Sequence, residues 1–199
     1  GGQNIGSGAF ANCTNLTSVT LTSSDFRGIG ANAFENTAID NFTLPDGTYT
    51  IGDNAFKDCT ALTIVNLSDR TRPTFGRSVF IGATSFAGSA TSGFFIKGYS
   101  SWHNSNYSTS SGVLYSLDGY ELISVPAYTK DFLMSVLVDK IADGALSGVQ
   151  LSNELDMTRI RQIGKYAFAD SSVTKVTFEN LTTIPEGLFA GCSKLTEVV

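Results

Sequence analysis

Apolar residues recur along this chain in one fixed arrangement. The clearest copy covers residues 51–67, where an Ile-Gly pair is followed by Ala55 and Phe56 and then by the pattern L-x-x-V-x-L from Leu62 to Leu67. Further copies start at positions 5, 29, 163 and 184, with more degenerate ones at 75 and 141, and neighbouring copies start 21 to 24 residues apart. A period of this length indicates a solenoid in which each copy forms one coil.

Each copy predicts short strands joined by a sharp bend. The V-x-L part alternates apolar and polar residues, as expected for a strand with one buried face. So short a strand needs partners for its backbone groups, and stacked coils supply them as a parallel sheet along one side. The glycine after Ile51 permits the bend, and residues 53–56 favour one helical turn with Asp53 as its cap. We therefore expect a mainly β fold with short helical turns.

One large apolar side chain per copy is expected to fill the interior of the coil. Burying a phenylalanine in this way contributes roughly 1.5–3 kcal/mol. In the clearest copy this residue is Phe56, and the other copies place Phe10, Phe34, Phe80, Leu146, Phe168 and Phe189 at the same position.

The three cysteines, Cys13, Cys59 and Cys192, share one repeat position, three residues after the phenylalanine. Cys13 and Cys59 lie two coils apart, roughly 10 Å at the spacing of neighbouring strands. A disulfide bridges at most about 7 Å between Cα atoms. We expect all three thiols to be reduced, buried and inert.

The repeat is interrupted once, which divides the chain into three parts. Residues 1–86 form a first repeat block, residues 87–131 an insert, and residues 132–199 a second block that continues the same solenoid. Within the insert, two apolar runs flank Asp118-Gly119, which predicts a β-hairpin with a two-residue type I′ turn. Because both ends of the chain fall within the repeat pattern, we expect it to be a segment of a longer protein.

The blocks I-G-x-x-A-F-x-x-C/T/S followed by L-T-x-V-x-L, as in residues 5–21 and 51–67, resemble the BspA-type leucine-rich repeat family of bacterial surface proteins. The resemblance covers residues 5–86 and 132–199. Inserts with the core V-L-Y-S-x-D-G-x-x-L-I-x-x-P, present here from Val113 to Pro126, occur in the same family. The resemblance implies a right-handed leucine-rich-repeat solenoid with parallel strands that is non-catalytic, lies outside the cell and serves adhesion or partner binding.

Composition narrows the possible functions. The net charge of −5 argues against general binding of nucleic acid or an anionic membrane. No apolar run approaches the roughly 18 residues of a membrane span. Only 16% of the residues are charged, which fits an extracellular solenoid better than a cytosolic enzyme. The chain opens with Gly1-Gly2, without an initiator Met or a signal peptide, as a trimmed segment would.

Catalytic, metal and cofactor sites find little support. The G-x-G-x-x-A match at residues 28–33 consists of repeat positions and lacks the βαβ unit of a dinucleotide site. His103 is the only histidine, and no C-x-x-C pair is present, so neither a catalytic dyad nor a zinc site is indicated. We expect a non-enzymatic protein without a cofactor.

Two surfaces are candidates for binding. In L-x-x-V-x-L the residues before and after the V face outward and stack into rows. In the first block these rows are uncharged, and all of their residues are polar except Ile64. They are Ser18, Thr20, Asn41, Thr43, Ile64 and Asn66. In the second block they carry Glu154, Asp156, Lys175, Thr177 and Glu197, with Glu179 two residues beyond Thr177. This mainly acidic row suits a basic partner, although it is equally compatible with an ordinary solvated face.

The second candidate surface is aromatic. Tyr99, Trp102 and Tyr107 in the insert could stack on a sugar, or could cover the end of the first repeat block. The leading hypothesis is therefore an extracellular or cell-surface module that binds a protein or extracellular-matrix ligand. A carbohydrate-binding surface module and a purely structural spacer without a ligand are the alternatives.

Overall fold

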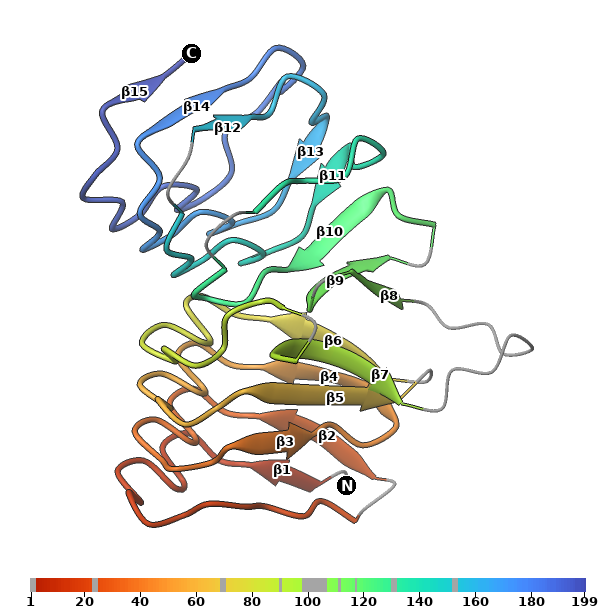
Figure 1. Ribbon diagram of the computed structural model, residues 1–199, viewed down its shortest axis with the longest axis vertical. Coiled ribbons are helices and arrows are strands. Elements are labelled where there is room, and N and C mark those ends of the chain that lie inside the picture. The colour runs from red at the N-terminus through yellow and green to blue at the C-terminus, as the bar shows by residue number, and fades with distance from the viewer. Residues whose placement is uncertain are drawn as a thin grey trace.

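The chain winds into coils that stack along the long axis of the molecule, from the N-terminus at one end to the C-terminus at the other (Figure 1). The structure is a computed structural model that describes residues 3–22, 25–68, 71–89, 91–97, 107–110, 112–116, 118–129, 132–151 and 154–199. Strands and tight turns account for its regular structure, and these residues form no helix. The expected parallel-strand solenoid is confirmed, whereas the expected short helical turns are replaced by tight turns.

Two parallel ladders, rather than one, line the first block. The Ile-Gly segments form the sheet β1-β2-β4-β6, and the V-x-L segments form the sheet β3-β5-β7. The first comprises β1 (Gln3–Ile5), β2 (Phe26–Ile29), β4 (Gly47–Ile51) and β6 (Thr71–Phe75). The second comprises β3 (Asn41–Thr43), β5 (Ile64–Ser68) and β7 (Gly93–Lys97). Because β7 pairs along its length with β5, the ladder of the first block runs on past residue 86.

The turn of each coil is made by two residues with positive φ, four positions apart. The described residues contain seven such pairs: 8 and 12, 32 and 36, 54 and 58, 78 and 82, 144 and 148, 166 and 170, and 187 and 191. Glycine, asparagine and aspartate tolerate this left-handed conformation best, and they occupy every position except Ser78 and Tyr166. A helical turn cannot pass through a left-handed residue, which explains why residues 53–56 form a tight turn.

Stacked phenylalanine rings fill the interior of the coils, as predicted. Phe34 is fully buried and lies between Phe10 and Phe56, with ring centroids 5.3 and 5.2 Å away. In the second block Phe168 stacks on Phe189 at 5.4 Å. Phe10 is 37% exposed because it lies in the first described coil, which has a neighbouring coil on one side only.

The same end effect corrects one expectation about the cysteines. All three are free, as predicted. Cys59 is buried and Cys192 is half-buried, but Cys13 is exposed rather than buried. Its repeat position is covered in the coils that have neighbours on both sides, and the first coil has only one.

The insert forms a wall between two hydrophobic cores, which we call the septum. It contributes β8 (Tyr107–Ser110), β9 (Val113–Ser116) and β10 (Glu121–Ser124), paired antiparallel in that order. Leu114 and Ile123 pack into the core of the first block. Val113, Tyr115 and Leu122 pack into the core of the second. Side chains of a strand alternate between its two faces, so this hairpin closes both cores at once.

The second block is built on the hairpin. β10 pairs in parallel with β11 (Lys140–Ile141), and β11 pairs with β13 (Gln162–Ile163). The hairpin strand thus takes the place of a coil strand in this ladder. The V-x-L segments form a separate sheet of β12 (Leu155–Asp156), β14 (Lys175–Thr177) and β15 (Glu197–Val198).

The hairpin turn differs from its predicted type. A type I′ turn needs positive φ at both central residues, but only Gly119 of the Asp118-Gly119 pair has it, at φ 77. Asp118 Oδ1 instead accepts hydrogen bonds from the Ser116 hydroxyl at 2.6 Å and from the Tyr120 backbone at 3.1 Å. The aspartate therefore stabilises the turn through its side chain, which relieves Asp118 of a left-handed backbone.

Candidate functional site

The charged row predicted on the second block lies on three neighbouring strands. Glu154 directly precedes β12, which contains Asp156; β14 contains Lys175 and Thr177; and β15 contains Glu197. β14 lies between the other two, with Asp156 opposite Thr177 and Lys175 opposite Glu197. Glu154, Asp156 and Glu197 are exposed, and Lys175 and Thr177 are half-buried. Glu179 is exposed in a bend beyond the end of β14.

Lys175 is held among carboxylates. Its Nζ lies 3.0 Å from Glu197 Oε2. The hydrogen bond and the charge of Glu197 raise the pKa of Lys175, and the charge of Glu154 adds to this effect. The lysine is therefore fixed by its neighbours, and negative charge remains in excess along the row.

Asp156 is oriented by its own turn. Its Oδ1 accepts hydrogen bonds from the Thr158 hydroxyl at 2.7 Å and the Thr158 backbone at 2.9 Å. Both hydrogen bonds lower the pKa of Asp156, and the one from the hydroxyl has the larger effect. The carboxylate thus stays ionised at neutral pH and points in a fixed direction, as a charge that selects a partner must.

The corresponding row of the first block is neutral and partly covered. Asn41 and Thr43 are exposed on β3, as expected, but Asn66 on β5 is only 3% exposed. Its Nδ2 donates to Asn41 Oδ1 at 2.7 Å, and β7 places Phe95 beside it on the other side. Asn66 therefore lies in the outward row with Asn41, as expected, but it is covered rather than exposed because the ladder continues into β7.

The aromatic alternative can be placed only in part. Tyr99 and Trp102 lie outside the described residues, and Tyr107 begins β8, where only its backbone is described. A sugar platform on these three residues remains a prediction.

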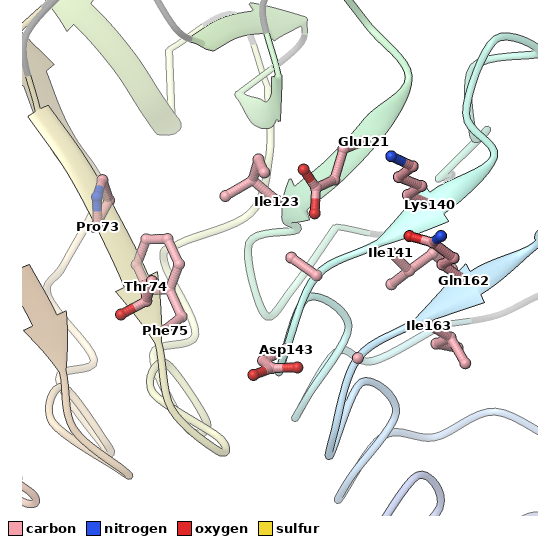
Figure 2. A pocket seen from close by; sticks show the side chains of 12 residues that line it. Pro73, Thr74, Phe75, Glu121, Ile123, Lys140, Ile141, Asp143, Gln162 and Ile163 are labelled. Carbon is pink, nitrogen blue, oxygen red and sulfur yellow. The ribbon is translucent and has the colours of Figure 1, made fainter. Parts of the chain in front are cut away.

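A groove of about 460 Å³ lies where the two blocks meet (Figure 2). One wall is β6, with Pro73, Thr74 and Phe75, and the other is the sheet of β10, β11 and β13. Glu121, Lys140 and Gln162 stand in register across that sheet. β6 is the outer strand of its sheet, and a proline suits such a position because it has no N–H to offer an added strand. This groove could not be predicted from the repeat pattern.

A polar cluster on the turn side also joins the two blocks. Ser78 donates from its backbone to Ser147 Oγ at 2.8 Å and from its hydroxyl to Asp170 Oδ2 at 2.6 Å. The Arg77 guanidinium lies 5.9 Å from the centre of the Tyr166 ring. Ser78 and Tyr166 are the two residues that break the Gly/Asn/Asp rule at left-handed positions. That departure is the sequence signal that could have revealed the cluster.

In the described part of the chain, no three His, Cys, Asp or Glu side chains are grouped so as to hold a metal ion. The charged row offers fixed charges and hydroxyl groups on a backbone held by two ladders of hydrogen bonds. Among the described residues, no helix has the length and apolar character that crossing a membrane requires.

Comparisons with known proteins agree with this architecture. A leucine-rich repeat protein from Eubacterium ventriosum has a similar structure, with a TM-score of 0.62 and 21% identity over 98% of this chain. A leucine-rich cell surface protein from Faecalibacterium prausnitzii gives a TM-score of 0.51 and 24% identity over 97% of the chain. The chain spans 63% of the length of each. A comparison with curated proteins gives no match.

The family comparison is more specific than the structural one. Six copies of a repeat match in residues 1–97 and 128–199, which include β7 and leave out most of the septum formed by the insert. The two matched ranges coincide with the coils whose left-handed pairs and stacked rings are described above. The chain therefore belongs to the family of the BspA-type leucine-rich repeat region.

Proposed function

We propose that this chain is a non-enzymatic interaction module, extracellular or on the cell surface, that binds a protein or matrix ligand through the charged row. The observation that carries the proposal is the clamped position of Lys175, 3.0 Å from Glu197 and next to Glu154. Because the lysine is held in place, the row presents a fixed pattern with carboxylates in excess. Such a pattern steers association with a basic surface and discriminates against acidic ones.

The rigidity of the strands supports this role. β12, β14 and β15 are joined in register, so neighbouring side chains keep their spacing when a partner approaches. Little ordering is then needed on binding, which preserves affinity. The charges add little to stability where they are exposed, so recognition is a better account of their alignment on one face.

The proposed location rests on likeness. The protein from Faecalibacterium prausnitzii is described as a leucine rich cell surface protein, and this chain shares its fold. A surface location also fits the low share of charged residues. Adhesion to a host or matrix protein would be a natural use of such a surface.

The test is a binding panel. The immobilised chain is exposed to purified extracellular-matrix proteins and to a glycan array at low and moderate salt. We expect a protein ligand whose affinity falls as salt is added, since exposed charges are screened within about 10 Å at 0.1 M. Binding of glycans alone would favour the carbohydrate-binding alternative with Tyr99, Trp102 and Tyr107, and the absence of any ligand would favour a structural spacer.

A further inference from the structure

Exposed apolar side chains gather at one place beside the charged row. Away from the first and last coils, the exposed large apolar residues in the described part of the chain are Tyr120, Leu133, Val136 and Leu137, at 51, 86, 72 and 52% exposure. We call these four residues the apolar rim. The hairpin turn lies beside the end of residues 133–137, because a Cβ added at Gly119 would lie 3.7 Å from Leu137 Cδ1 and Asp139 N donates to Tyr120 O at 3.0 Å. Exposed patches of this kind mark interaction sites more often than isolated apolar residues do.

A groove of about 300 Å³ connects the apolar rim to the charged row. Its base is apolar, with Phe132, Val138 and Leu155 between 1 and 6% exposed. Two segments line the groove, and we call them its walls: residues 132–138, with Leu133 and Val136, and residues 154–159, with Glu154 and Asp156. Arg159 also lines the groove, and its Nη1 donates to Val136 O at 3.3 Å.

Both walls are held in place before any partner arrives. β12 is the outer strand of its sheet and is fixed by β14. On the other wall, the Ser135 backbone is hydrogen-bonded to the buried Tyr115 side chain of the septum. Residues 132–135 belong to no strand. This segment therefore runs between the V-x-L sheets of the two blocks without joining either ladder.

We propose that this groove binds an extended segment of a protein partner in which apolar side chains alternate with Lys or Arg. The proposal rests on the proposed function and names the chemistry of its partner. In an extended chain, successive side chains point to opposite sides. One set would therefore contact Leu133 and Val136 while the other reaches Glu154 and Asp156.

Charge and shape select this occupant over others. Two carboxylates and one cation, Arg159, line the groove, and Lys175 lies near Glu154 but outside the lining, so the lining carries an excess of negative charge that favours a basic segment. Tyr120 of the apolar rim does not line the groove. The groove itself offers a sugar ring little aromatic surface, since Leu133 and Val136 are aliphatic and Phe132 is only 3% exposed. An anionic lipid surface would be repelled by Glu154 and Asp156. In a symmetric dimer, a second copy of this chain would bring its own carboxylates to the same place.

The test uses three fluorescein-labelled hexapeptides that alternate Lys with Leu, Glu with Leu, and Lys with Ser. Binding to the complete chain is followed by fluorescence anisotropy at low salt. We expect the Lys-Leu peptide to bind about tenfold more tightly than either of the others, because only it satisfies both walls. Equal affinity for the three peptides would overturn the proposal.

Matched variants locate the binding site. Leu133→Ser with Val136→Ser, and separately Glu154→Gln with Asp156→Asn, should each weaken the Lys-Leu peptide about tenfold. Asparagine at 156 keeps an oxygen that can accept from Thr158. The controls are Ile184→Ser, which removes an apolar side chain 62% exposed in the last coil, and Asp40→Asn, an exposed carboxylate just before β3; both should bind as the wild type does.

Two outcomes separate this proposal from the function on which it rests. If a protein ligand from the panel depends on Glu154 and Asp156 but is unaffected by the Leu133 and Val136 changes, the groove is wrong and the charged row stands. If sedimentation shows a dimer that those two serine substitutions dissociate, a second copy occupies the groove and the peptide proposal fails. The proposal is supported if the groove variants lose peptide binding, the control variants keep it, and the wild type is monomeric.

Discussion

Arg77 and Asp170, 93 positions apart in the sequence, form a two-pronged ion pair: Nε lies 2.9 Å from Oδ2, and Nη2 lies 2.9 Å from Oδ1. The pair joins the last coil before the insert to a coil well beyond it. Glycine at 144 lets the second block approach this closely, since an added Cβ there would meet the Gly76 carbonyl oxygen. The two blocks are therefore locked on the turn side by an ion pair and on the strand side by the septum.

A double-mutant cycle should show that this ion pair stabilises the junction. Hydrogen bonds to charged groups contribute about 1.5–3 kcal/mol when well placed. Since both side chains are partly exposed, we expect Arg77→Ala and Asp170→Asn to couple by roughly 1–2 kcal/mol in urea unfolding. The matched control is Lys165 and Glu186, 2.9 Å apart but each 60% exposed, whose coupling should be clearly weaker because solvent screens it. Equal coupling in the two pairs would show that Arg77–Asp170 has no special role.

The same pair makes stability depend on pH. Burial raises the pKa of Asp170, but hydrogen bonds from Arg77 and Ser78 and the charge of Arg77 outweigh it and hold the pKa below its ordinary value. A carboxyl whose pKa is lower in the folded state stabilises that state while ionised. This contribution is present above the unfolded pKa of about 4 and is lost as the pH falls through the folded value.

We therefore expect the urea concentration at the unfolding midpoint to decrease as the pH is lowered below about 4. The decrease should be smaller in Asp170→Asn and in Arg77→Ala. Urea titrations at pH 7, 4 and 3 measure the difference. An acid loss in Asp170→Asn as large as in the wild type would assign the effect to other carboxylates.

The buried rings should account for much of the stability of each coil. Phe34→Ala empties a fully buried site between two stacked rings and should cost about 3–5 kcal/mol. Phe10→Ala, in the first coil and already 37% exposed, should cost clearly less. Chemical unfolding of both variants tests this, and a loss below about 1 kcal/mol for Phe34→Ala would mean that it does not fill the coil.

The repeat could be predicted from the sequence because every coil solves the same packing problem with the same residue types. Phe34 and Phe56 were placed correctly on that basis alone. The helical turn was mistaken because the left-handed pairs, such as Asn54 and Asp58, break it. The contact of Arg77 with Asp170, the septum and the covered Asn66 depend on how the insert joins the blocks. No periodic pattern encodes that join, because it occurs once.

The thiols should react in the order of their exposure. Cys13 is exposed and should react quickly with a disulfide reagent. Burial raises the pKa of Cys59, which lies 3.0 Å from the Phe34 carbonyl oxygen and should react only after denaturant is added. Burial likewise raises the pKa of the half-buried Cys192, which should react slowly at pH 8 and faster as the pH rises toward 10. A thiol titration in which Cys13→Ser loses the one fast-reacting group would support this order. A mass that shows an intramolecular disulfide would overturn the coil register.

The charged row is proposed to select the partner electrostatically. The most direct measurement is the association rate of a protein ligand from the panel with Glu154→Lys plus Asp156→Lys, at low and high salt. The matched control, Ser18→Lys plus Thr20→Lys, places the same lysines on equivalent exposed positions of the first coil. We expect the double reversal to slow association about tenfold at low salt and to flatten its salt dependence, while the control keeps the wild-type dependence. Unchanged binding in the double reversal, together with loss of binding on truncating Trp102, would contradict the claim and assign recognition to the insert.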